Sequence, residues 1–359
     1  MTGEITTVAI VALVGACASG GGPHMNPEDQ ASIDSLFAEY AGSAVPGASV
    51  IVIRDGRVLV RRAYGMADLE RHTPATPTTD YRLASVSKQF TAMAVMLLAN
   101  DGKLRYDQPM RDFLPELPQA AQAVTIRHLL NHTSGLIDYE DLVPGTRTAQ
   151  LDDRDVLALL APKDSLYFPA GSAYRYSNSG YVLLGLIVEC VSGMTFPRFL
   201  EIRVFRPLGM TATVAHVEGS DTVPQRACGY SPATTGFTNT DQSVTSATLG
   251  DGGIYMNVDD MLRWDEALYG TALVDAGALA LATTPPALPG GAPTQYGFGW
   301  YVDSYRGEQR WRHTGETSGF RNAIQRYPAR RFTVIVLTNR SSGDPGTIAD
   351  RIADRLLFR

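Results

Sequence analysis

Residues 85–100 read SVSKQFTAMAVMLLAN, and this stretch decides how the rest of the chain can pack. Beyond Lys88 it is apolar on almost every side, which predicts a helix from about Ser85 to Asn100 that is buried at the centre of the protein. The pair Asp101-Gly102 then provides a helix stop. Because Ser85 and Lys88 are three residues apart at the start of this helix, we expect their side chains to share one face.

Lysine is rare in this chain, which carries its positive charge almost entirely on arginine. The only lysines besides Lys88 are Lys103 and Lys163. Arginine stays protonated at any workable pH, whereas a desolvated lysine can lose its proton and act as a base. A lysine beside Ser85 therefore indicates an activated nucleophile. A Ser-x-x-Lys pattern also arises by chance about once in a chain of this length, so its context must decide.

Strand-like segments lie near both ends of the chain, and helical patterns fill the middle. At the first end, residues 48–54 and 57–64 flank Asp55-Gly56, a hairpin turn signal. Further strands are expected at 297–302, 310–313, 322–327 and 332–338, and helices at 125–131, 153–160, 181–191, 258–269 and 350–358.

The simplest packing of these segments is an α/β (α+β) fold with two lobes. We predict that residues 26–104 and 285–359 form one antiparallel sheet flanked by helices. A mostly helical lobe, 105–284, would be inserted between them. The helix that carries Ser85 would begin where the lobes meet, which is a common place for a cleft.

A second candidate motif is Tyr176-Ser177-Asn178, in a loop just before an apolar helix. Tyr176 could relay a proton if a nearby ammonium group lowers its pKa. The Asn178 amide could hold both Lys88 and a substrate carbonyl. The alternative interpretation is a helix-capping loop with a packed tyrosine.

A third candidate motif is His313-Thr314-Gly315, at the end of a strand-like run and followed by Glu316. Gly315 would let a substrate lie against the strand edge, where backbone N–H groups can bind a developing oxyanion. The alternative is a strand that simply ends in a glycine turn.

The order Ser-x-x-Lys, Tyr-x-Asn, His-Thr-Gly resembles the penicillin-recognising serine hydrolases of the class C β-lactamase group. That group includes D-alanyl-D-alanine carboxypeptidases, D-aminopeptidases and β-lactamase-like esterases. The resemblance covers about residues 30–358. It is supported by IRHLLNHTSG at 126–135 and GDGGIY at 250–255.

The resemblance implies a role for each matched residue. Ser85 would be acylated, Lys88 would accept its proton, and Tyr176 would assist proton transfer. Asn178, His313, Thr314 and Gly315 would contact the substrate, and the backbone N–H groups of Ser85 and Glu316 would form the oxyanion hole. No cofactor is implied.

One residue of the third motif and the residue that follows it favour one branch of this group. Its lactamases usually have lysine where this chain has His313, and imidazole attracts a carboxylate less strongly than ammonium does. Glu316 adds a negative charge nearby. We therefore expect an amide or ester hydrolase of the D-amino-acid peptidase or esterase type. The alternatives are a β-lactamase and, in another class, a non-catalytic penicillin-binding-like sensor or scaffold.

Composition narrows the possible partners. A net charge of −6 with no basic run argues against nucleic acid, and no stretch after residue 26 is apolar enough to span a membrane. His128 and His132 have a spacing that could bind zinc, but no third ligand is near in sequence. We expect a small-molecule or peptide-like substrate, and the sequence does not predict an oligomeric state.

Residues 1–25 are treated as a leader rather than as part of the fold. Their apolar stretch and Val14-Gly15-Ala16-Cys17 resemble a signal and lipobox, which would place the protein in the periplasm or outside the cell, with Cys17 as a possible lipid anchor. Glu4 and the lack of early basic residues argue against an export signal, and the GGGPHM run resembles an engineered junction, so both interpretations stay open.

Overall fold

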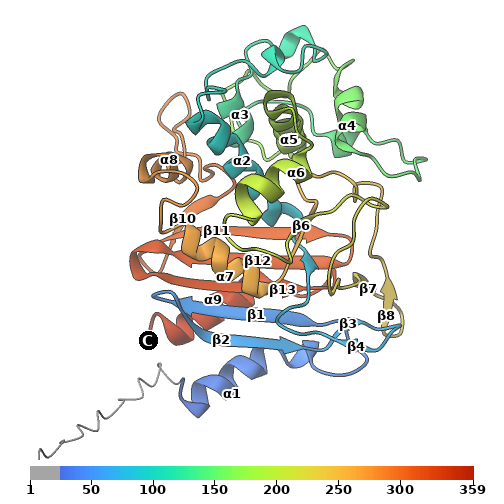
Figure 1. Ribbon diagram of the computed structural model, residues 1–359, viewed down its shortest axis with the longest axis vertical. Coiled ribbons are helices and arrows are strands. Elements are labelled where there is room, and N and C mark those ends of the chain that lie inside the picture. The colour runs from blue at the N-terminus through green and yellow to red at the C-terminus, as the bar shows by residue number, and fades with distance from the viewer. Residues whose placement is uncertain (1–24) are drawn as a thin grey trace, which may run out of the picture.

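The computed structural model describes residues 25–359, so the interpretations placed on Cys17 and the rest of the leader lie outside the described residues. The fold is built around a six-stranded antiparallel sheet with the strand order β10-β11-β12-β13-β1-β2. Both ends of the chain supply it, as predicted. Its strands, labelled in Figure 1, are β1 Ala48–Arg54, β2 Arg57–Tyr64, β10 Tyr301–Tyr305, β11 Glu308–Thr317, β12 Phe320–Tyr327 and β13 Phe332–Thr338.

The central strands of this sheet are buried on both faces, because their alternate side chains enter two different cores. Val50 and Val52 of β1 pack with helices α1 (Pro27–Leu36) and α9 (Pro345–Leu356). Ile51 and Ile53 face the larger core that continues into the helical lobe. This explains why β1 reads as a continuous run of β-branched residues rather than as an alternating strand.

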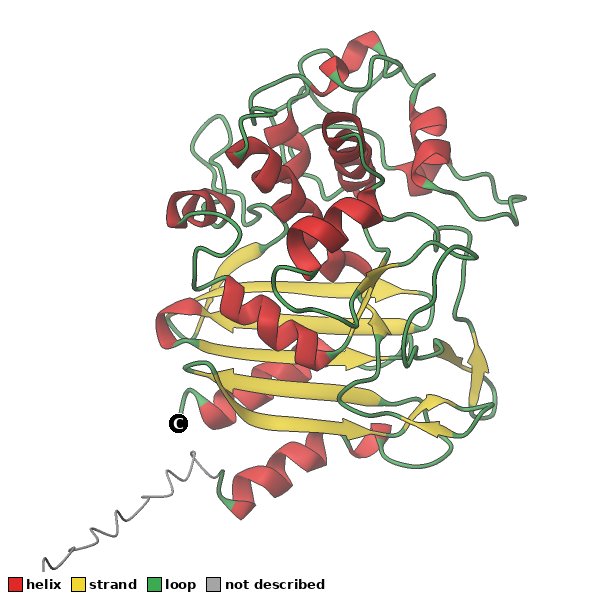
Figure 2. Cartoon of the chain, in the orientation of Figure 1, coloured by secondary structure: helices red, strands yellow, loops and turns green. Residues whose placement is uncertain are grey.

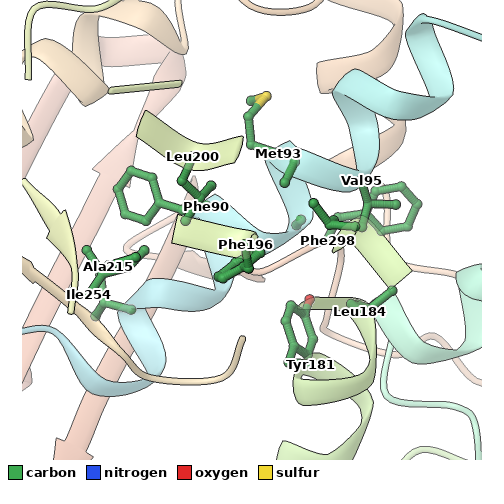
Figure 3. Packing of buried hydrophobic residues seen from close by; sticks show 14 of the residues in the cluster. Phe90, Met93, Val95, Tyr181, Leu184, Phe196, Leu200, Ala215, Ile254 and Phe298 are labelled. Carbon is green, nitrogen blue, oxygen red and sulfur yellow. The ribbon is translucent and has the colours of Figure 1, made fainter. Parts of the chain in front are cut away.

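The helices of the second lobe gather above the sheet, as Figure 2 shows. The long α2 and α5 pack against each other at its centre. Side chains from both helices meet those of neighbouring elements in one apolar cluster, part of which Figure 3 shows. The helices are α2 Lys88–Asn100, α3 Ile126–Leu130, α4 Asp153–Leu160, α5 Asn178–Ser192, α6 Phe196–Leu200 and α8 Ala276–Ala282.

Short strands connect the lobes. The three-stranded sheet β5-β9-β6 leads the chain into Ser85. The helix α7 (Val258–Ala267) falls inside the range predicted for the helical lobe, yet it packs on β1 and β13 of the large sheet. The domain boundaries at 104 and 285 stay a prediction. The remaining strands are β3 Met66–Asp68, β4 Thr73–Pro74, β5 Tyr81–Arg82, β6 Val214–Ala215, β7 Tyr230–Pro232, β8 Phe237–Asn239 and β9 Ile254–Met256.

Two expected elements begin later than predicted, for reasons that lie in tertiary packing. Residues Ala84–Ser87 form a 3₁₀ turn, so the α-helix starts at Lys88 rather than Ser85. The strand expected from residue 297 starts at Tyr301. Gly299 has φ +78° and lies so close to the backbone of Gln89 that a Cβ would be 2.8 Å from its Cα, so the chain bends here instead of pairing.

No single helix in residues 25–359 is long and apolar enough to cross a membrane. α5 and the following segment 196–205 pass such a test only as a pair bent by 74°.

Candidate active site

The turn that presents Ser85 is held by a close contact between two backbone segments. Gly315 of β11 lies against Leu83, so that a Cβ at this position would be 2.0 Å from the Leu83 carbonyl oxygen. Ala84 has φ +50°, a left-handed conformation that costs free energy in any residue except glycine. The structure therefore corrects our reason for Gly315: it makes room for the chain's own Leu83 rather than for a substrate.

Lys88 is completely buried and reaches three oxygen atoms. Its Nζ lies 3.0 Å from Ser85 Oγ, 2.8 Å from Asn178 Oδ1 and 3.0 Å from the carbonyl oxygen of Asp251. Burial lowers the pKa of Lys88 to about 8, although nearby carboxylates, Asp251 foremost, favour its charged form. The amine is thus both in contact with the candidate nucleophile and easier to deprotonate than an exposed lysine.

Tyr176 lies beside this pair, with its ring centroid 5.0 Å from Lys88 Nζ. Its hydroxyl is buried and has no hydrogen-bond partner within residues 25–359. Burial raises the pKa of Tyr176 well above its ordinary value, and the Ser85 hydroxyl offsets only part of that rise. The expectation that a nearby ammonium would lower this pKa was wrong, because burial dominates. Tyr176 is a neutral phenol at physiological pH.

Asn178 begins α5 and is fully engaged by its neighbours. Its Oδ1 accepts from Lys88, its Nδ2 donates to Glu140 Oε1 at 3.1 Å, and its backbone N–H donates to Asp138 Oδ2 at 2.6 Å. Burial raises the pKa of both carboxyl groups. Asp138 and Glu140 did not emerge from the sequence, because only long-range folding brings this loop to Asn178.

A small cavity of about 40 Å³ opens beside Ser85. Ser85 and Glu316 both line it, so the two backbone N–H groups expected to form the oxyanion hole belong to residues on its wall. The residues that line it are Arg82, Ala84, Ser85, Tyr139, Glu140, Asn178, Thr245, Thr248, Asp251, Gly252, Glu316 and Thr317.

His313 and Thr314 were expected to contact the substrate, but neither lines this cavity. The His313 ring is buried, with Nε2 2.9 Å from the Tyr296 hydroxyl and Nδ1 2.6 Å from the Thr314 carbonyl oxygen. Burial, reinforced by the charge of Lys88, lowers the pKa of His313 to about 3. It is therefore a neutral, internally bonded residue. The Thr314 methyl lies on the side of Gly346 in α9.

The two imidazoles of the possible zinc pair are surrounded by other parts of the chain. His128 Nδ1 accepts the Thr125 backbone N–H at 3.2 Å, and the His132 ring packs among tyrosine rings. In the described part of the chain, no three His, Cys, Asp or Glu side chains are grouped so as to hold a metal ion.

Comparison with known proteins identifies the family to which a chain with this site belongs. The Beta-lactamase family model matches residues 33–357. The chain belongs to the β-lactamase family. It is 31% identical to a penicillin-binding protein of Bacillus subtilis (strain 168), over 88% of this chain and 73% of that protein. It is also 31% identical to a D-aminopeptidase of Cereibacter sphaeroides, over 90% of this chain but only 62% of the relative.

Solved structures agree with this assignment. A penicillin-binding protein homologue from Pyrococcus abyssi, described as octameric, superposes with a TM-score of 0.79 at 27% identity, covering 92% of this chain and 77% of that one. A D-amino acid amidase from Ochrobactrum anthropi SV3, complexed with L-phenylalanine amide, gives 0.76 at 25% identity, covering 92% and 98%. The predicted family and fold are confirmed. The prediction of a serine hydrolase is confirmed at the level of the family.

Proposed function

We propose that this protein is a serine hydrolase that cleaves amide bonds next to D-amino-acid residues through an acyl-enzyme on Ser85. The observation that carries the proposal is the 3.0 Å contact between Lys88 Nζ and Ser85 Oγ, made by a buried amine whose pKa is lowered to about 8. A D-aminopeptidase and a D-amino acid amidase among the similar proteins supply the substrate class.

In the proposed reaction, neutral Lys88 takes the hydroxyl proton of Ser85 as Oγ attacks the substrate carbonyl carbon. The N–H groups of Ser85 and Glu316 stabilise the oxyanion. The C–N bond then breaks, and Tyr176, a neutral phenol, passes a proton to the leaving amine and is reprotonated from Lys88. Water attacks the ester by the same route in reverse and releases the acid, which regenerates Ser85.

Charge around the cavity supports a substrate with a free amino group. Glu140, Asp251 and Glu316 all contribute to its lining, and Arg82 is the one basic residue among the residues that line it. This net negative charge attracts an ammonium group and repels a carboxylate. It therefore favours D-amino-acid amides over anionic β-lactams, and hydrolysis of β-lactams remains the second candidate.

The test compares two serines of the same turn. Ser87 also lies in the 3₁₀ turn, but its Oγ accepts the Ile254 backbone N–H at 3.3 Å and takes no part in the proposed chemistry. Purified wild type, Ser85→Ala and Ser87→Ala would be assayed with D-alanine p-nitroanilide, its L enantiomer and benzylpenicillin, with intact-mass spectrometry to detect acyl adducts.

We expect the wild type and Ser87→Ala to hydrolyse the D-anilide in preference to the L form, and Ser85→Ala to be inactive and unlabelled. Residual activity of Ser85→Ala at the wild-type level would exclude the acyl-enzyme. Rapid hydrolysis of benzylpenicillin with no action on the D-anilide would favour the β-lactamase.

A further inference from the structure

His132, which lies outside the cavity, makes three contacts with Tyr176 and the two residues beside it. The carbonyl oxygen of His132 accepts the backbone N–H of Arg175 at 3.0 Å, and its Nδ1 accepts that of Ser177 at 3.2 Å. These two N–H groups belong to the residues on either side of Tyr176. The His132 ring also packs on the Tyr176 ring, with centroids 4.2 Å apart and planes inclined by 37°.

The backbone of His132 is itself strained. It has φ +56° two residues after the end of α3, and the residue is only 1% exposed. A non-glycine residue persists in this left-handed region only where its surroundings hold it there, and such residues concentrate at functional sites. Here the strained conformation lets the carbonyl and the ring of one residue act on the same short segment.

The hydrogen bonds also fix the state of the imidazole. Since Nδ1 accepts the Ser177 N–H, the ring proton must be on Nε2, which has no partner within residues 25–359. Burial, together with the charge of Lys88, keeps the pKa of His132 well below its ordinary value. A protonated ring would lose its acceptor and place a second cation near Lys88.

We infer that His132 is a positioning residue that fixes the ring and hydroxyl of Tyr176 for proton transfer during acylation and deacylation. The inference rests on the proposed function, because it assigns Tyr176 a step in that reaction. His132 does not line the substrate cavity. Its loss should therefore slow turnover and leave substrate binding nearly unchanged.

Three variants separate these contacts. His132→Phe keeps an aromatic ring but removes the acceptor for the Ser177 N–H. His132→Asn keeps a side-chain oxygen that can accept that N–H, and asparagine tolerates the left-handed conformation, but the ring contact is lost. The matched control is His128→Phe, because His128 Nδ1 also accepts a backbone N–H, that of Thr125, at the start of α3 and away from Tyr176.

Each variant would be assayed for kcat and KM on D-alanine p-nitroanilide, with thermal unfolding to confirm the folded state. We expect kcat of His132→Phe to fall roughly 10- to 100-fold with little change in KM, because an unpaired buried N–H releases the Tyr176 segment. His132→Asn should lose roughly 3- to 10-fold in kcat, and His128→Phe should lose stability but keep its kcat.

Several results would overturn the inference. These are a wild-type kcat in folded His132→Phe, a defect confined to KM, or the same kcat loss in His128→Phe. If His132→Phe fails to fold, a wild-type kcat in His132→Asn would overturn it. Failure of the wild type to cleave the anilide would remove the proposed function, and this inference with it.

Discussion

Within residues 25–359, Lys88 and Arg326 are two completely buried cationic side chains, and their surroundings differ in one respect. Arg326 in β12 meets the carboxylate of Asp265 in α7, with Nε 2.6 Å from Oδ1. Lys88 in α2 contacts only uncharged oxygens: a hydroxyl, an amide and a backbone carbonyl. The charge of Arg326 in the sheet is therefore neutralised by a carboxylate. The charge of Lys88, at the boundary between the lobes, has no such partner in contact among the described residues and is destabilised by burial. An unpaired amine can give up its proton, and this is the property the proposed chemistry requires.

The largest effect should come from fixing the charge of Lys88. Lys88→Arg keeps a cation but removes a group able to lose a proton, so kcat/KM on the D-anilide should fall about 10²- to 10⁴-fold. Lys103→Arg and Lys163→Arg, both at exposed positions, should be as active as the wild type. A Lys88→Arg enzyme with more than a tenth of wild-type activity would show that no deprotonation is needed.

Breaking the ion pair between Arg326 and Asp265 should lower the stability of the fold rather than the rate of the reaction. Arg326→Met leaves Asp265 buried and uncompensated, which should lower the free energy of unfolding by about 3–5 kcal/mol. Arg331→Met is the control, because Arg331 stacks on the same Tyr269 ring but is exposed, and it should cost less than about 0.5 kcal/mol. Denaturant titration measures the free energy of unfolding of both variants. Equal losses would mean that the contact with the Tyr269 ring, rather than the ion pair, accounts for the loss of stability.

Removing the charge of Lys88, which has no carboxylate in contact within residues 25–359, should have a smaller effect and should increase the free energy of unfolding. The folded protein releases the Lys88 proton near pH 8, whereas the unfolded chain holds it to about its ordinary pKa of 10.5. Lys88 therefore destabilises the fold below pH 8, and this cost declines as the pH rises from 8 toward 10.5. At pH 7, Lys88→Met should raise the free energy of unfolding by up to about 3 kcal/mol.

The gain in Lys88→Met should shrink when the same unfolding measurement is repeated above pH 8. A variant that is less stable than the wild type across this range would mean that the lost hydrogen bonds outweigh the burial of charge.

Local signals in the sequence were enough to predict much of the fold. The strands 48–54, 57–64 and 332–338 have the predicted bounds, because turn residues and runs of β-branched side chains mark them directly. The late start of α2 could not be predicted this way. It depends on Gly315 meeting Leu83 across more than two hundred residues of chain.

The same contrast applies to the candidate site. The short motifs identified Ser85, Lys88, Tyr176 and Asn178, and the structure brings these residues together. The neutral state of His313 and the carboxylates at 138 and 140 depend on burial and on loops that approach from elsewhere. Asp251 lay inside a motif already noted, but its carbonyl, not its side chain, contacts Lys88.

The most direct test of the unpaired amine is a titration of the lysine side chains by NMR, made practical because the chain contains only three lysines. With isotope-labelled lysine, the signal that disappears in Lys88→Arg identifies Lys88. We predict that this signal titrates with a pKa near 8, well below the ordinary lysine value of 10.5. If the Lys88 signal instead titrates near 10.5, burial does not make Lys88 a base, and the account of this site is wrong.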